Sequence, residues 1–166
     1  AAPALVYDRA AIFAGEVWRL WTGHEVHWGT AHLGWNLAIF VPAGVWAERL
    51  APSRTRLFLA LAPGAVSLGL LVFAPTLARY AGLSGLASGI LALLAFTQLS
   101  ARTAERWFWW SVLALLALKI GAELFATHPF FARFSDPAIR PVPLAHAAGV
   151  LVAGLLHFGK KSPATT

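Results

Sequence analysis

Long runs of uncharged residues most restrict how this chain can fold. Four runs contain no Asp, Glu, Lys or Arg, at 28–47, 57–78, 80–101 and 141–159. A fifth, beginning at residue 107, is interrupted only by Lys119 and Glu123, and we expect its helix to cover 107–127. Uncharged runs of 18 or more residues are typical of membrane-spanning helices. Because backbone polar groups in lipid must be satisfied within the segment, we expect an all-α polytopic membrane helix bundle with five transmembrane helices.

The composition agrees with a membrane protein of one domain. Hydrophobic residues make up 58% of the 166 residues and charged residues only 12%, which excludes an ordinary soluble domain. We expect a single membrane domain, 1–166, with residues 1–27 as an interfacial loop segment. The net charge of +6 lies mostly in short loops, so we expect a lipid bilayer and no nucleic acid as partner. The absence of cysteine excludes disulfides, thiol catalysis and Cys-ligated metals, and we expect no cofactor.

The distribution of positive charge predicts the orientation of the bundle. If the five helices alternate in direction, one side holds Arg49, Arg54, Arg56, Arg102, Arg106, Lys160 and Lys161. The other side holds Arg9, Arg19, Arg79, Arg133 and Arg140. Since the more basic side faces the cytoplasm, we expect the N-terminal segment and the start of run 80–101 on the outer side.

Four polar side chains are expected at one depth near this outer side. Ser84 lies in the sequence Gly-Leu-Ser-Gly at 82–85, about four residues into its run, and His146 lies about five residues into the last run. His32 and Asn36, four apart on one helix face, lie near the outer end of the first run. At 1.5 Å per residue, all four fall within roughly 10 Å of the outer boundary. Helix packing alone explains many Gly-Ser pairs, but this coincidence favours a functional site.

These residue types fit nucleophilic catalysis. A serine hydroxyl becomes reactive when a neighbouring base takes its proton, and His146 can do so for Ser84 near neutral pH. The oxyanion that forms needs hydrogen-bond donors, which Asn36, His32 and the Ser84 backbone N–H can supply. We expect Gly82 and Gly85 to let a substrate approach, and Gly85 and Gly149 to let the two catalytic helices touch.

The same motifs resemble the rhomboid intramembrane serine proteases. They are Gly-x-Ser-Gly at 82–85, His-x-x-x-Asn at 32–36 and Ala-His-x-x-Gly at 145–149. Trp18 and Arg19 match the Trp-Arg loop of that family, and Glu48 resembles the end of its second helix. The resemblance covers residues 9–156 in the right order. It implies a serine endopeptidase that acts on membrane-anchored protein substrates.

Further details look like rhombosortases, a subgroup of short bacterial rhomboids. They are Tyr-Asp-Arg at 7–9, the Gly-Glu-x-Trp-Arg-Leu-x-Thr-Gly-His sequence at 15–24, and Lys119 with Glu123. This resemblance implies secreted substrates with a C-terminal Gly-Gly sorting tail. It also implies the bacterial inner membrane as location, with the active site toward the periplasmic side.

Two departures from the family pattern affect these expectations. A rhomboid core has six helices, and we expect the helix before the Trp-Arg loop to be absent from this chain, with residues 1–6 as its stump. Many rhomboids also carry an aromatic residue four positions after the nucleophile, where this chain has Ser88. Another group must therefore hold the imidazole of His146, or the ring is held less firmly.

The remaining polar residues suggest structural roles. His24 and His27 are three apart, whereas the zinc protease motif His-Glu-x-x-His needs a spacing of four, so we expect no metal site. We expect a wet interfacial loop here, in which His24 is an ordinary interfacial residue, with a substrate-facing or loop-ordering role as the alternative. Lys119 and Glu123 are four apart within a membrane helix, so we expect a buried structural pair, with substrate contact as the alternative.

Three classes of function remain open. The first is the rhomboid-type serine protease. The second is a non-catalytic rhomboid-like membrane protein that binds client helices. The third is a small transporter or assembly factor whose histidines line a solute path.

Overall fold

The computed structural model describes residues 3–102, 104–125 and 141–159. Two short helices and five long ones follow in chain order: α1 (Arg9–Phe13), α2 (Arg19–Thr22), α3 (Thr30–Leu50), α4 (Pro52–Phe73), α5 (Ser84–Ser100), α6 (Arg106–Phe125) and α7 (Pro143–Phe158). Strands β1 (Tyr7–Asp8) and β2 (Arg79–Tyr80) form a small antiparallel ribbon in which Tyr7 pairs with Tyr80.

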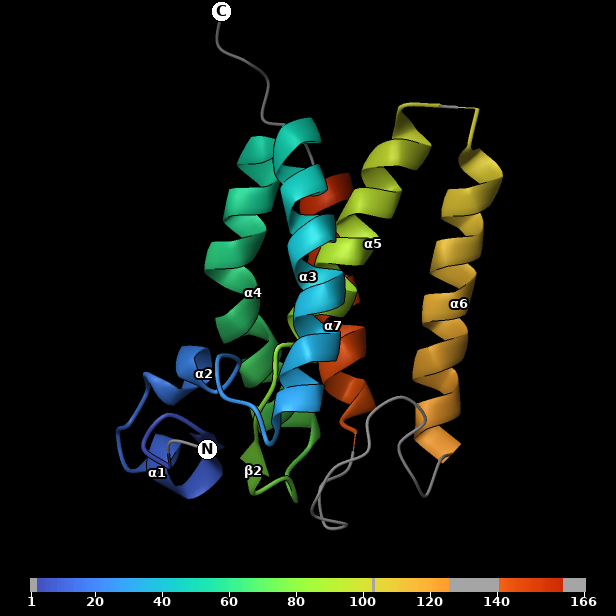
Figure 1. Cartoon of the computed structure of the whole chain (residues 1–166). Helices are drawn as coiled ribbons and strands as arrows, with labels where there is room; N and C mark the ends of the chain where they lie inside the picture. The colour runs from blue at the N-terminus through green and yellow to red at the C-terminus, as the bar shows by residue number, and fades with distance from the viewer. Residues whose placement is uncertain (1–2, 103, 126–140, 160–166) are drawn as a thin grey trace, which may run out of the picture.

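The five long helices run alternately up and down around α5 (Figure 1). Most of α5 between Gly85 and Ala95 is buried, and its most extensive contact is with α7. Helix α3 packs against α5 and helix α4 mainly against α7, whereas α6 stands at one side and is largely exposed. The N-terminal ends of α3, α5 and α7 therefore lie together at one end of the bundle.

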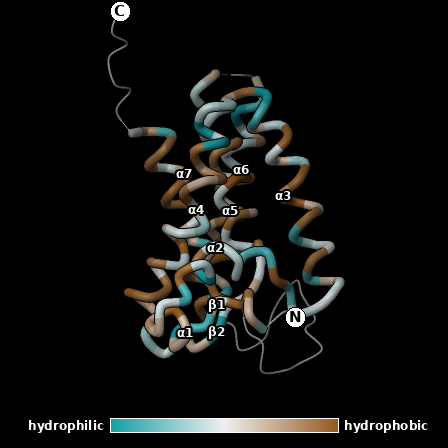
Figure 2. Tube along the Cα trace, turned by 90° about the vertical axis from the view of Figure 1, so that its left-hand side faces the viewer, coloured by the Kyte–Doolittle hydropathy of each residue, from teal (hydrophilic) through white to brown (hydrophobic). Residues whose placement is uncertain are grey.

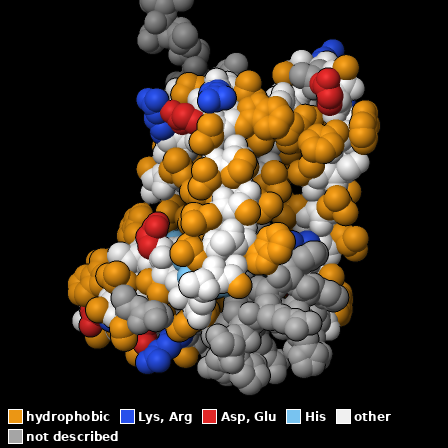
Figure 3. Space-filling view, in the orientation of Figure 1, with side chains coloured by type: hydrophobic (Ala, Val, Ile, Leu, Met, Phe, Trp, Pro, Cys, Tyr) orange, Lys and Arg blue, Asp and Glu red, His pale blue; other side chains and the backbone are white. Residues whose placement is uncertain are grey.

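The outer surface of the bundle is unusually apolar. Large hydrophobic side chains are exposed along α3, α4, α6 and α7. On the face drawn in Figure 3, hydrophobic side chains cover the middle of the bundle and charged ones gather mainly toward its two ends. The tube of Figure 2 likewise shows mostly hydrophobic residues along the long helices. A soluble monomer rarely exposes such continuous apolar area, so this surface suits lipid. Within the described residues, α4 and α6 are long and apolar enough to cross a membrane. Helices α5 and α7 are apolar but shorter, at 17 and 16 residues.

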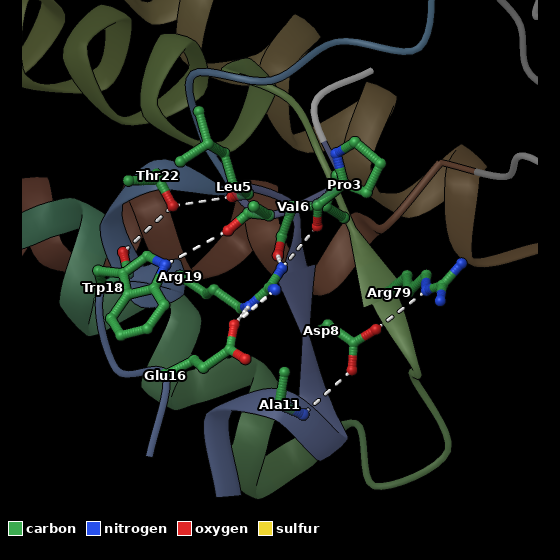
Figure 4. Close-up of polar contacts among 11 residues, drawn as sticks. Pro3, Leu5, Val6, Asp8, Ala11, Glu16, Trp18, Arg19, Thr22 and Arg79 are labelled. Atoms are coloured by element: carbon green, nitrogen blue, oxygen red, sulfur yellow. Dashed lines mark hydrogen bonds and ion pairs between the residues drawn. The ribbon is translucent and has the colours of Figure 1, made fainter. Parts of the chain in front are cut away.

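The N-terminal segment folds beside the end of the bundle where α5 begins. Arg19 organises it from a buried position, donating from Nη1 to the carbonyl oxygens of Pro3 at 2.7 Å and Val6 at 2.8 Å (Figure 4). Its Nε donates to Glu16 Oε2 at 2.7 Å. Residues 3–5 form turns rather than a helix, and α1, α2 and β1 occupy the segment expected to be an interfacial loop.

Two helices, α4 and α5, begin or end several residues away from the expected positions for local reasons. The helix expected from residue 80 begins at Ser84, because residues 79–80 pair with β1 and Gly82 has a φ of +132°. The helix expected over 57–78 is α4, which begins at Pro52 in the favourable first turn and ends at Phe73, two residues before Pro75. The ends of an uncharged run therefore do not coincide with the ends of a helix. A helix can continue into charged residues, as α4 does at its start, or it can end before the next charged residue, as α4 does at Phe73. Residues 126–127 of the expected fifth helix lie outside the described residues.

Candidate active site

Ser84 is the first residue of α5 and is half-buried at the end of the bundle. The chain reaches it through a turn at Gly82, whose φ of +132° favours glycine. The buried hydroxyl of Tyr80 donates to the Gly82 carbonyl oxygen at 2.7 Å and fixes this turn. Burial raises the pKa of Tyr80 to about 12, with the Ser84 side chain opposing the shift, so the phenol stays a neutral donor.

His146 meets Ser84 across the contact between α7 and α5. The distance from Nε2 of His146 to Oγ of Ser84 is 2.9 Å, and the imidazole is almost fully buried. These two residues are 62 positions apart in the sequence.

Glycines allow this close approach of the two helices. A Cβ atom placed on Gly85 lies 2.8 Å from the carbonyl oxygen of Ala145, and one placed on Gly149 overlaps the carbonyl oxygen of Gly85. A Cβ placed on Gly89 lies 2.5 Å from the carbonyl oxygen of Gly149. Larger residues at these positions would push α5 and α7 apart.

His32 and Asn36 of α3 flank the turn before Ser84. A Cβ placed on Gly82 lies 2.7 Å from Cε1 of His32 and 3.9 Å from Nδ2 of Asn36. Asn36 is buried, and within the described part of the chain its Nδ2 has no hydrogen-bond partner. An available amide donor therefore lies beside the serine turn. The His27 ring, half-buried next to His32, accepts from the backbone N–H of Leu83 at 3.3 Å.

The Lys119–Glu123 pair of α6 also belongs to this cluster. Lys119 Nζ lies 2.7 Å from Glu123 Oε1, as expected for an intrahelical pair. The other oxygen, Oε2, lies 2.6 Å from Nδ1 of His146. This second contact was not expected from the sequence. The sequence feature that could have predicted this contact is Glu123 itself, a carboxylate near the end of an expected membrane helix and at the expected depth of His146.

The Trp-Arg loop makes its contacts within the N-terminal segment. Trp18 is exposed and its Nε1 donates to the Ala4 carbonyl oxygen at 3.3 Å, while Arg19 holds the N-terminal segment together.

His24 is fully buried, and its Nε2 lies 3.0 Å from both the Pro63 carbonyl oxygen and Ser67 Oγ. His24 is therefore not the solvated interfacial residue that was expected, and its buried contacts support the alternative of loop ordering.

The helical bundle thus has an apolar outer surface, and a serine, a histidine and a buried asparagine amide lie together at one of its ends. The family model of the Rhomboid domain matches residues 14–160, and the chain belongs to the rhomboid family. This family is embedded in membranes, and its members are generally intramembrane serine proteases that act on membrane protein substrates. Searches of curated proteins and of solved structures gave no significant match.

Proposed function

We propose that this chain is a serine protease in which Ser84 is the nucleophile and His146 the general base. The observation that carries the proposal is the 2.9 Å distance between Oγ and Nε2. During attack, Oγ bonds to the scissile carbonyl carbon and its proton passes to Nε2. The imidazolium then gives this proton to the leaving nitrogen, which releases one product and leaves the other as an ester on Ser84. Water is the simplest acceptor that completes the reaction.

Three donors are proposed to stabilise the tetrahedral intermediate. The carbonyl oxygen becomes negatively charged when Oγ attacks, and donors already aimed at it lower the barrier. Nδ2 of Asn36, the ring of His32 and the backbone N–H of Ser84 surround the turn at Gly82. The unpartnered state of Asn36 Nδ2 within the described residues supports this role.

The family and the charge pattern support a proposed location and a proposed substrate. In this proposal all five long helices span the bacterial inner membrane, and the site lies near its periplasmic face. The substrate is a membrane-anchored protein cleaved at the outer end of its own helix. The rhombosortase-like motifs at 7–9 and 15–24 favour a C-terminal Gly-Gly tail on a secreted protein. Glycine suits such a site because it lowers the cost of unwinding a helix by roughly 1 kcal/mol relative to alanine.

Labelling with a fluorophosphonate tests the nucleophile directly. We expect the parent protein in detergent to be labelled at Ser84, and S84A and H146A to lose both labelling and cleavage. The double variant should be no worse than either single one, since the two residues act as one unit. The chain provides a matched control at the opposite end of the same helices, where Ser100 Oγ lies 2.8 Å from Nε2 of His157.

The control pair is changed in the same way. S100A and H157A should keep labelling at Ser84 and cleavage of substrate. A parent protein that is folded but not labelled at Ser84 would contradict the proposal. The chain would then be interpreted as a non-catalytic rhomboid-like protein that binds client helices.

A further inference from the structure

The second ring nitrogen of His146 has an acidic partner on a different helix. Nδ1 lies 2.6 Å from Oε2 of Glu123, and the two side chains are 4% and 6% exposed. If Oγ of Ser84 donates its proton to Nε2, then Nε2 carries no hydrogen and the neutral ring must carry its hydrogen on Nδ1. This Nδ1–H needs an acceptor, and the Glu123 carboxylate is placed to be that acceptor.

Lys119 completes the arrangement by balancing the charge of Glu123. A carboxylate this deeply buried is costly unless it is paired, and Lys119 Nζ lies 2.7 Å from its Oε1. Nζ also lies 3.2 Å from Nδ1 of His146. In the tautomer required by Ser84 both of these nitrogens are donors, so they share the carboxylate rather than bonding to each other. Lys119 therefore favours an ionised Glu123 that accepts hydrogen bonds from both.

We infer that Glu123 is a third member of the site, a positioning residue that holds the His146 ring in the productive tautomer and stabilises the imidazolium formed during attack. Lys119 acts through Glu123 by keeping it ionised. This inference rests on the proposed function, in which His146 is the general base. It also answers how the ring is held where many relatives have an aromatic residue and this chain has Ser88.

The control pair at the other end of the helices lacks this arrangement. His157 also bonds to a serine through Nε2, but its Nδ1 has no hydrogen-bond partner within the described residues. Only the Ser84–His146 pair thus has a carboxylate behind the ring. His32 of α3 also lies close enough to interact electrostatically with His146.

Kinetics of E123Q, E123D and K119M test the inference. We expect E123Q to lower kcat by about 10²–10⁴-fold with little change in KM, because the loss arises after substrate binds. E123D should recover part of this loss, because it restores a carboxylate one methylene shorter. K119M should lower kcat less than E123Q, and the double variant should be close to E123Q alone. The matched control is E48Q, which removes the 2.7 Å contact with Arg56 at the other end of the bundle and should retain the parent kcat.

A spectroscopic measurement on the parent protein needs no destabilising variant. Proton–nitrogen NMR of ¹⁵N-histidine-labelled protein should contain a strongly deshielded Nδ1–H signal that disappears in H146A. A ring of His146 protonated at Nε2 instead would overturn the inference even if E123Q failed to fold. So would a folded E123Q variant whose kcat stays within about threefold of the parent's.

The outcomes separate the two proposals. If H146A is inactive and E123Q is fully active, the general base stands and only the role of Glu123 fails. If H146A labels at Ser84 as fast as the parent does, the proposed function fails whatever E123Q does.

Discussion

Gly149 of α7 lies directly against the backbone carbonyl of Gly85 in α5, so no side chain separates the helices that carry His146 and Ser84. We predict that G149V pushes these helices apart and lowers kcat/KM for cleavage by at least about 10²-fold, since a displacement near 1 Å has that effect. Fluorophosphonate labelling should fall in parallel. G44A is the matched control, because a Cβ there meets nothing within 4 Å. A G149V protein that cleaves at the parent rate would show that the helix contact is not needed.

Asn36 offers a measure of oxyanion stabilisation. N36A removes one donor beside the serine turn, and we predict a loss of about 10²–10³ in kcat. Substrate binding should change little, because the donor is needed when the oxyanion forms. Single-turnover rates separate these effects. An unchanged rate in N36A would remove Asn36 from the site.

The burial of His24 should make the stability of the fold depend on pH. Burial lowers the pKa of His24 to about 4 from the ordinary 6.5, with backbone hydrogen bonds opposing the shift. Between these two values the unfolded chain binds a proton that the folded chain does not, so stability falls as pH drops from about 6.5 to about 4. The full effect is at most roughly 3 kcal/mol.

Thermal unfolding in detergent at several pH values checks this prediction. H24Q should have a lower Tm than the parent at pH 7.5, and the difference should shrink at pH 5 as the parent loses the stability due to a neutral His24. H27Q serves for comparison: burial also lowers the pKa of this half-buried histidine of the same loop, but by less, so the Tm difference between parent and H27Q should vary less with pH. A constant difference between parent and H24Q across this range would contradict the linkage.

The glycines of the substrate tail provide the test of specificity. Replacing both glycines of a Gly-Gly tail by leucine, at equal hydrophobic length, should strongly reduce cleavage because leucine strengthens the helix and crowds the turn at Gly82. Mass spectrometry of the products locates the cleaved bond. Cleavage at the same rate and the same bond would replace the Gly-Gly proposal with a general rhomboid specificity.

The sequence predicted the helical bundle because the positions of the helices follow from where charge is absent; the depth of the polar residues in a membrane stays a prediction. It also predicted the Lys119–Glu123 pair, since four residues span one helical turn. The contact of Glu123 with His146 depends on how α6 is rotated toward α7, and no periodicity within one helix reports that rotation. The pairing of Tyr7 with Tyr80 could not be predicted from the sequence either, because strands of two residues are too short to show an alternating pattern of polar and apolar residues.

Helices α5 and α7 form a Ser–His contact at each end, but the α5 backbone gives the two ends opposite electrostatic environments. Ser84 stands at the N-terminus of α5, where unpaired N–H groups and the helix dipole favour negative charge. Ser100 stands at the C-terminus of the same helix, where carbonyl oxygens oppose an alkoxide or oxyanion. The direction of the α5 backbone dipole thus favours a negatively charged intermediate at Ser84 and disfavours one at Ser100. The same pair of side chains therefore cannot react equally well at the two ends of the bundle.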